Sequence, residues 1–217
     1  MNNGRSPRHK FGSRNATFDE PRYGRTFAVI CPIGMGMNVP VETRGERYRA
    51  AILRAFVELI FRDGFEKISV QAIVAGAGVA RSTFYEHFSS KEDVLRASLA
   101  QFFEVLARCL SSEAQPPDLV HVLAHFWENR RLTDAIFAGT PRRILALSLS
   151  EMIEARLREV GETLLIPSRL VAIQLAEAQL ALVESWLRGR AFVRAEDLAA
   201  ALHQSSRGSV NALISVS

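Results

Sequence analysis

Cysteine is scarce in this sequence, which has two, Cys31 and Cys109, in 217 residues. Small secreted domains without a large core are held by several disulfides, so two cysteines exclude that class. A single disulfide between them stays open, but two separate thiols agree better with a reducing cytoplasm. Metal-ligand patterns are missing too, because His121 and His125 have no cysteine or carboxylate pattern beside them. We expect no metal site and no cofactor.

Long apolar runs are also missing. Although 48% of the residues are hydrophobic, no run approaches the roughly 18–20 residues that cross a membrane. The stretch from Phe27 to Met37 is short and is broken by Pro32, Gly34 and Gly36. No small-residue cleavage site follows it, so we do not interpret it as an export signal. We expect a cytoplasmic protein with no membrane contact.

Strand-like alternation and long sequence repeats are missing as well. Helical periodicity instead covers most of the chain after Arg44, which predicts an all-α fold. The sequence has no nucleophile–base arrangement, no phosphate loop and no zinc spacing, so we expect no enzyme. Its formal net charge of +4 permits nucleic-acid binding without demonstrating it.

The chain divides into three segments. Residues 1–43 contain Gly, Pro, Asn, Ser and scattered Arg without a helical period, which predicts a disordered extension. This extension is either a basic arm that adds phosphate contacts or, as we favour, a stretch upstream of a translation start at Met35 or Met37. Residues 44–96 form a predicted three-helix domain, and residues 97–217 form a larger helical domain.

Tight turns separate the helices of the 44–96 domain. The first helix ends at Asp63, where Gly64 supplies the positive φ of a helix C-terminus. Ser69 is placed to cap a short second helix, and Gly78 ends it. A short helix, a glycine turn and another short helix on a longer first helix together predict a helix-turn-helix.

The helix predicted at 81–88 has two different faces. At about 100° per residue, Phe84 and Phe88 point inward, while hydroxyls and an arginine lie outside. Such a helix presents its N-terminal side chains to the major groove, where Arg pairs with guanine and Thr contacts a thymine methyl. The predicted base contacts are Arg81, Ser82, Thr83 and Gln71. The predicted phosphate contacts are Ser69, Tyr85, His87, Lys91 and Arg47.

The next helix begins at a serine. Either Ser89 or Ser90 can cap it, and Ser89 with Glu92 has capping-box spacing. Lys91 lies in its first turn, whose amides also attract a phosphate. Further helices are predicted at about 117–130, 141–160, 167–189 and 195–204.

Residues 65–92 read FEKISVQAIVAGAGVARSTFYEHFSSKE. This segment resembles the DNA-binding signature of the TetR family of repressors, and the resemblance covers about residues 46–96. The chain departs from the family pattern at Ala80, where Ser or Thr is frequent, and at Ile73-Val74, where Ile-Ala is more usual. The resemblance implies a homodimeric repressor that a small-molecule effector, bound in a divergent C-terminal domain, releases from a palindromic operator.

The helix predicted at 167–189 is apolar around more than half of its circumference. A helix packed on one core needs an apolar stripe about 100° wide, so the excess favours a second buried side against another copy of the chain. The family resemblance also implies such a dimer. A central helix of a monomeric bundle is the alternative. The predicted interface residues are Ala172, Ala176, Leu180, Val183, Leu187, Leu198 and Leu202.

Aromatic and polar side chains are interspersed between residues 100 and 160. Ligand pockets are mostly apolar with a few placed polar groups, so this region is the candidate effector site, although core packing is the more usual role of such aromatics. The predicted lining residues are Phe103, His121, His125, Phe126, Trp127, Phe137, Glu151 and Met152. An interaction protein of the same fold, regulated by a protein partner or without any ligand, is the alternative function.

Overall fold

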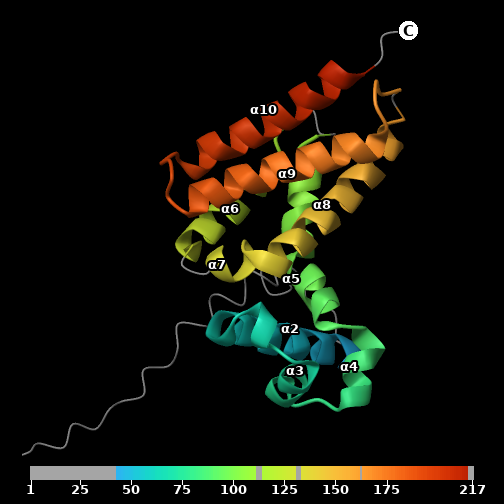
Figure 1. The fold of residues 1–217 in the computed structure, drawn as a ribbon, viewed down its shortest axis with the longest axis vertical. Helices are drawn as coiled ribbons and strands as arrows, with labels where there is room; N and C mark the ends of the chain where they lie inside the picture. The colour runs from blue at the N-terminus through green and yellow to red at the C-terminus, as the bar shows by residue number, and fades with distance from the viewer. Residues whose placement is uncertain (1–42, 111–113, 131–132, 162, 215–217) are drawn as a thin grey trace, which may run out of the picture.

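The computed structural model describes residues 43–110, 114–130, 133–161 and 163–214. These residues have the predicted all-α architecture, in which an isolated antiparallel bridge between Leu164 and Ile214 is the one β contact. Figure 1 shows a small group of helices at one end, a larger bundle at the other, and one helix running between them. The extension predicted for residues 1–43 lies outside the described residues except for Thr43, and so does Cys31.

The small group of helices is the helix-turn-helix unit. It consists of α2 (Arg44–Asp63), the short 3-10 helix η1 (Phe65–Lys67), α3 (Val70–Ala77) and α4 (Arg81–His87). The helix that leaves this unit is α5 (Lys91–Arg108). The bundle consists of α6 (Leu119–Glu128), α7 (Thr133–Ile136), α8 (Gly139–Val160), α9 (Ser168–Leu187) and α10 (Ala195–Leu213). The predicted 195–204 helix is therefore longer than expected, and α7 was not predicted.

A capping box that the sequence analysis missed begins α2. The Thr43 hydroxyl accepts a hydrogen bond from the Glu46 N–H at 3.2 Å, and the Glu46 carboxylate accepts from the Thr43 N–H at 2.7 Å. The two bonds satisfy donors that a helix start otherwise leaves unpaired. The hydrogen bond from the Thr43 backbone lowers the pKa of Glu46 below its ordinary value.

Ser90, rather than Ser89, caps α5. The Ser90 hydroxyl accepts from the Asp93 N–H at 3.2 Å. The Ser89 N–H donates instead to the Asp93 carboxylate at 3.2 Å. The capping box predicted between Ser89 and Glu92 is therefore wrong by one residue. The pair that forms is shifted because the chain stays extended through Ser90.

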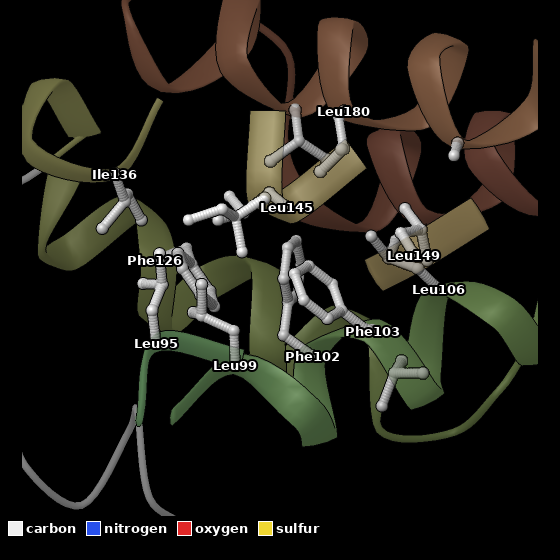
Figure 2. Packing of buried hydrophobic residues seen from close by; sticks show 14 of the residues in the cluster. Leu95, Leu99, Phe102, Phe103, Leu106, Phe126, Ile136, Leu145, Leu149 and Leu180 are labelled. Atoms are coloured by element: carbon white, nitrogen blue, oxygen red, sulfur yellow. The ribbon is translucent and has the colours of Figure 1, made fainter. Parts of the chain in front are cut away.

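The interior of the bundle is filled with side chains. The rings of Phe102 on α5 and Phe126 on α6 are 4.5 Å apart between centroids. Figure 2 shows leucines from α8 and α9, among them Leu145 and Leu180, in the same cluster as these rings. Dense packing of this kind stabilises a fold in proportion to the apolar area it removes from water. The aromatic side chains of α5 and α6 therefore belong to the core.

The predicted dimer-interface residues lie inside the subunit. All seven are buried, with relative exposures between 0 and 3%: Ala172, Ala176, Leu180, Val183, Leu187, Leu198 and Leu202. Their side chains pack within one chain because α9 is covered by α8 on one side and contacts α10 on another. The prediction that these residues contact a second copy was wrong. The large apolar side chains that α9 exposes are Leu170, Ile173 and Leu182.

Helix α9 also has the length and hydropathy of a membrane-spanning segment. Half of its most apolar window is buried inside the bundle. Burial on two sides explains its composition, because the core helix of a helical bundle needs apolar residues around much of its circumference.

Candidate nucleic-acid interface

A left-handed turn at Gly78 joins α3 to α4. Gly78 has φ 64° and ψ 32°, a conformation that costs residues with a Cβ roughly 1–2 kcal/mol. The turn closes with a hydrogen bond from the Val79 N–H to the Val74 carbonyl at 3.3 Å. The Ser69 hydroxyl caps α3 by accepting from the Ala72 N–H at 3.2 Å. The predicted cap and turn are both confirmed.

Helix α4 rests on a small apolar core. Phe84 is fully buried, Phe88 is 6% exposed, and their ring centroids are 6.0 Å apart. Ile73 of α3 and Phe56 of α2 belong to the same buried cluster. A seven-residue helix is too short to be stable alone, so these contacts fix its direction. They also oblige the opposite side of α4 to face outward.

The outward side of α4 carries polar side chains. Arg81, Ser82, Tyr85 and Glu86 are exposed, and Thr83 is partly exposed. The Arg81 guanidinium donates to the Tyr85 hydroxyl at 3.3 Å and lies 5.6 Å from the centre of its ring. Hydroxyl, phenol and guanidinium groups are thus presented together on this exposed side of α4. Such groups can donate to base edges and to phosphates.

Other predicted contact residues lie on neighbouring elements. Ser69 and Gln71 are exposed at the start of α3, and Arg47 is exposed in the first turns of α2. The hydroxyl of Ser69 accepts one hydrogen bond as a cap and keeps its proton to donate. Lys67 in η1 is also exposed and was not predicted. Its signal in the sequence was a basic residue two positions before a capping serine.

Lys91 is used inside the subunit. Its ammonium donates to the backbone carbonyls of Phe65 at 2.9 Å and Ile68 at 3.0 Å. It also lies 4.5 Å from the centre of the Phe65 ring. These contacts attach η1 to the start of α5. Lys91 thus has a structural role in the subunit, and its predicted phosphate contact stays a prediction.

His87 is directed toward the start of α2. Its Cε1 atom lies 3.6 Å from the position that a Cβ on Gly45 would occupy, and the residue is only partly exposed. The same side chain lines a groove with Arg49 of α2. The structure therefore separates His87 from the polar face formed by Arg81, Ser82 and Tyr85.

The helix-turn-helix unit matches a known family. Residues 52–98 match the family model described as bacterial regulatory proteins, tetR family. The matched segment contains the Ser69 cap, the Gly78 turn and the whole of α4. This segment of the chain is therefore similar to the TetR family of regulatory proteins.

Individual curated relatives match a part of the chain. The DNA-binding transcriptional repressor TetR of Mycobacteroides abscessus is 32% identical over 56 residues, which are 26% of this chain and 30% of that protein. The uncharacterized HTH-type transcriptional regulator YvdT of Bacillus subtilis is 41% identical over 59 residues, 27% of this chain and 29% of that protein. The match thus spans less than a third of each of these curated relatives.

A solved structure of a TetR transcriptional regulator from Streptococcus agalactiae 2603V covers more of the chain. It is 26% identical, covers 75% of this chain and 95% of its own, and superposes with a TM-score of 0.49.

The residues predicted to line a ligand pocket fall into two groups. The first group lies on α6 or just after α7: His121, His125, Phe126, Trp127 and Phe137. Its aromatic members pack on neighbours, since Trp127 stacks on Trp186 with centroids 4.8 Å apart and Phe137 is 2% exposed. Burial lowers the pKa of His125, whose Nε2 lies 2.6 Å from the Asn129 side-chain amide. The second group is Phe103, Glu151 and Met152, which line one groove together.

Proposed function

We propose that the chain is a DNA-binding transcriptional regulator, and that it acts as a homodimeric repressor which a small-molecule effector releases from a palindromic operator. The observation that carries the proposal is the geometry of α4. Its Phe84 side is fixed to α2 and α3, and its polar side is exposed from Arg81 to Glu86. A recognition helix needs this combination in order to enter a major groove without losing its own core.

The exposed side chains are of the types that contact bases and phosphates of duplex DNA. Base contacts are proposed for Arg81, Ser82, Thr83 and Gln71, because their groups can pair with base edges. Phosphate contacts are proposed for Ser69, Tyr85 and Arg47, with Lys67 added from its exposure. The similarity of residues 52–98 to a family model of bacterial regulatory proteins supports the proposal.

Two copies are proposed because one copy of α4 is short. A seven-residue helix reaches few base pairs, whereas two copies about 34–36 Å apart read two half-sites one duplex turn apart. The large exposed apolar side chains of α9, which are Leu170, Ile173 and Leu182, offer a surface for the second copy. On α10 the exposed residues Ala201 and Gly208 are small enough for close approach.

The test is a fluorescence-anisotropy titration with duplex DNA from upstream of the gene for this chain. We expect Arg81→Ala to weaken binding about 5- to 150-fold, the range of about 1–3 kcal/mol that a base contact supplies. Arg190→Ala is the matched control, because Arg190 is an exposed arginine in the turn after α9. It should bind with unchanged affinity.

The same samples report two further properties. Arg47→Ala should flatten the dependence of log affinity on log salt by about 0.9, because it removes one cation that is proposed to neutralise a phosphate. Sedimentation at the titration concentrations should give the mass of two chains. Equal duplex affinity in wild type and Arg81→Ala would contradict the proposed interface, and a monomer bound to the duplex would contradict the homodimer.

A further inference from the structure

A groove lies where the helix-turn-helix unit meets the bundle. It has a volume of about 600 Å³, within the range of about 300–1,000 Å³ of small-molecule sites. Its walls come from both parts of the molecule, because Arg49 belongs to α2 and His87 to α4, whereas Ser148 and Met152 belong to α8. Helix α5 forms the wall between them. A molecule bound in the groove would therefore contact both the helix-turn-helix unit and the bundle.

The lining of the groove is largely apolar. Helix α5 contributes Ala97, Ala100 and Phe103, and α8 contributes Met152 and Ala155. Three of these five side chains are methyl groups, so they leave space between two helices that pack closely elsewhere. The shape and the lining suit the flat apolar body of a small molecule.

A buried hydroxyl in the same groove has no partner. Ser148 is 8% exposed, and within the described residues its Oγ atom has no hydrogen-bond partner. Two other buried serines behave differently. Ser98 and Ser150 donate to the carbonyls three residues earlier, at 2.7 and 2.8 Å. A buried hydroxyl that is left unpaired is costly and calls for a partner from outside the chain.

The groove also holds an uncompensated cation. The Arg49 guanidinium lies 5.6 Å from the centre of the Phe88 ring, and in the described part of the chain no carboxylate forms an ion pair with it. The other arginine, Arg96, is paired with Asp93 at 3.1 Å. Glu151 is exposed to solvent, where its charge is screened. The inner part of the groove is therefore suited to an anion.

We propose that this groove binds a small amphipathic anion. Its apolar body would lie on Ala97, Ala100 and Phe103, its anionic group would face Arg49, and a hydrogen-bonding group would meet the Ser148 hydroxyl. The effect of such a ligand on duplex binding rests on the proposed function. Since the walls belong to both parts of the molecule, a ligand that prefers one arrangement of them changes duplex affinity, and the duplex changes ligand affinity by the same factor.

Two fluorescent probes test the binding site without DNA. 1-Anilinonaphthalene-8-sulfonate is an amphipathic anion, and N-phenyl-1-naphthylamine has the same aromatic body without the sulfonate. Wild type should bind the sulfonate about tenfold more tightly, as one charge-assisted hydrogen bond supplies. Ala100→Phe fills the groove and should weaken sulfonate binding at least about tenfold, whereas Ala191→Phe, at an exposed position outside it, should not. Undiminished binding to Ala100→Phe overturns the site.

Two substitutions test the polar contacts. Arg49→Gln should remove the preference for the sulfonate and leave the neutral probe unaffected, and a preference that persists in this variant overturns the anion-binding role. Ser148→Ala should weaken both probes without lowering the melting temperature, because the hydroxyl has no partner to lose in the free protein. A lowered melting temperature with unchanged probe affinity overturns the role of Ser148.

A third experiment measures the coupling between probe binding and duplex binding. The affinity for the sulfonate is determined with and without saturating upstream duplex, and we expect the two values to differ at least about fivefold. Equal probe affinities with and without duplex would overturn the coupling between the two sites. They would leave the proposals of a ligand-binding groove and of duplex binding unchanged. Absence of duplex binding in the titration without probe would contradict the proposed function instead, and the groove would still be judged by Ala100→Phe.

Discussion

The helix-turn-helix unit and the bundle are stabilised in different ways. Helices α2 and α3, and α5 that follows them, each begin with a serine or threonine whose hydroxyl accepts from a backbone N–H. In the bundle α6, α8, α9 and α10 have no side-chain cap. Three of them have 19 to 22 residues, but length does not separate the two parts, because α2 also has 20 residues. A capped start satisfies backbone donors locally, whereas the uncapped bundle helices depend on burial.

Ion pairs differ in reach between the two parts. Around the helix-turn-helix unit the pairs among the described residues join residues close in sequence, such as Arg62 with Asp63. The bundle has such near pairs as well, but it also has pairs between helices, because Arg142 of α8 contacts Glu177 and Glu184 of α9 at 2.6 and 3.5 Å. Arg108 at the end of α5 similarly reaches Asp118 before α6 at 2.5 Å. Among the described residues, ion pairs between helices are therefore a feature of the bundle.

The comparison is tested most strongly by the small core under α4. Phe84→Ala removes a fully buried ring and should lower the free energy of unfolding by about 3–5 kcal/mol, because local caps cannot replace this packing. Phe192→Ala, at a side chain that is 83% exposed, is the control and should be close to neutral. Guanidinium unfolding followed by circular dichroism measures both. A loss under about 1 kcal/mol in Phe84→Ala would show that the unit does not depend on this core.

A glycine pair sharpens the comparison. Gly78 in the helix-turn-helix unit and Gly161 after α8 both have positive φ, 64° and 71°, with open space where a Cβ would lie. Replacing either with Ala should cost about 1–2 kcal/mol of stability. Only Gly78→Ala should also weaken duplex binding, since it alone sets the direction of α4. Equal duplex affinity for Gly78→Ala and Gly161→Ala would show that the turn at Gly78 does not affect duplex binding.

The smallest expected effect concerns the start of α2. Thr43→Ala removes one half of its capping box and should cost about 1 kcal/mol. The hydrogen bond from Thr43 lowers the pKa of Glu46 in the folded chain. The stabilisation by Glu46 is therefore full above its unfolded pKa of about 4.3 and is lost as the pH falls through the lower folded value.

Melting temperatures between pH 7 and pH 3 measure this effect. The difference between wild type and Glu46→Gln should shrink over the acidic part of this range. A difference that stays constant at all pH values would mean that the Glu46 charge contributes nothing to the helix start.

The sequence was most informative where structure is local. Ser69, Gly78 and the inward direction of Phe84 could be predicted because caps, positive φ and helical spacing depend on residues a few positions apart. The dimer face could not, because an apolar residue such as Leu180 has the same pattern whether it packs on its own chain or on another. The structural contacts of Lys91 could not be predicted for a related reason, since its partners Phe65 and Ile68 lie 26 and 23 residues away.

The pocket prediction shows the same limit. Periodicity placed Phe126 and Met152 in one group of aromatic and polar residues, but the fold put Phe126 into the core and Met152 into the groove. The hydroxyl of Ser148 and the guanidinium of Arg49 gave no signal in the sequence. Their significance depends on what surrounds them in space, because an unpaired group is recognised only when its neighbours are known.

Helix α5 has a mechanical consequence. Its 18 residues contain neither glycine nor proline, so it has no built-in point of bending and behaves as a stiff lever about 27 Å long. A tilt of about 10° at the bundle end would displace the other end by about 5 Å, close to one helical turn. A small tilt of α5 at the bundle therefore displaces its other end, at the helix-turn-helix unit.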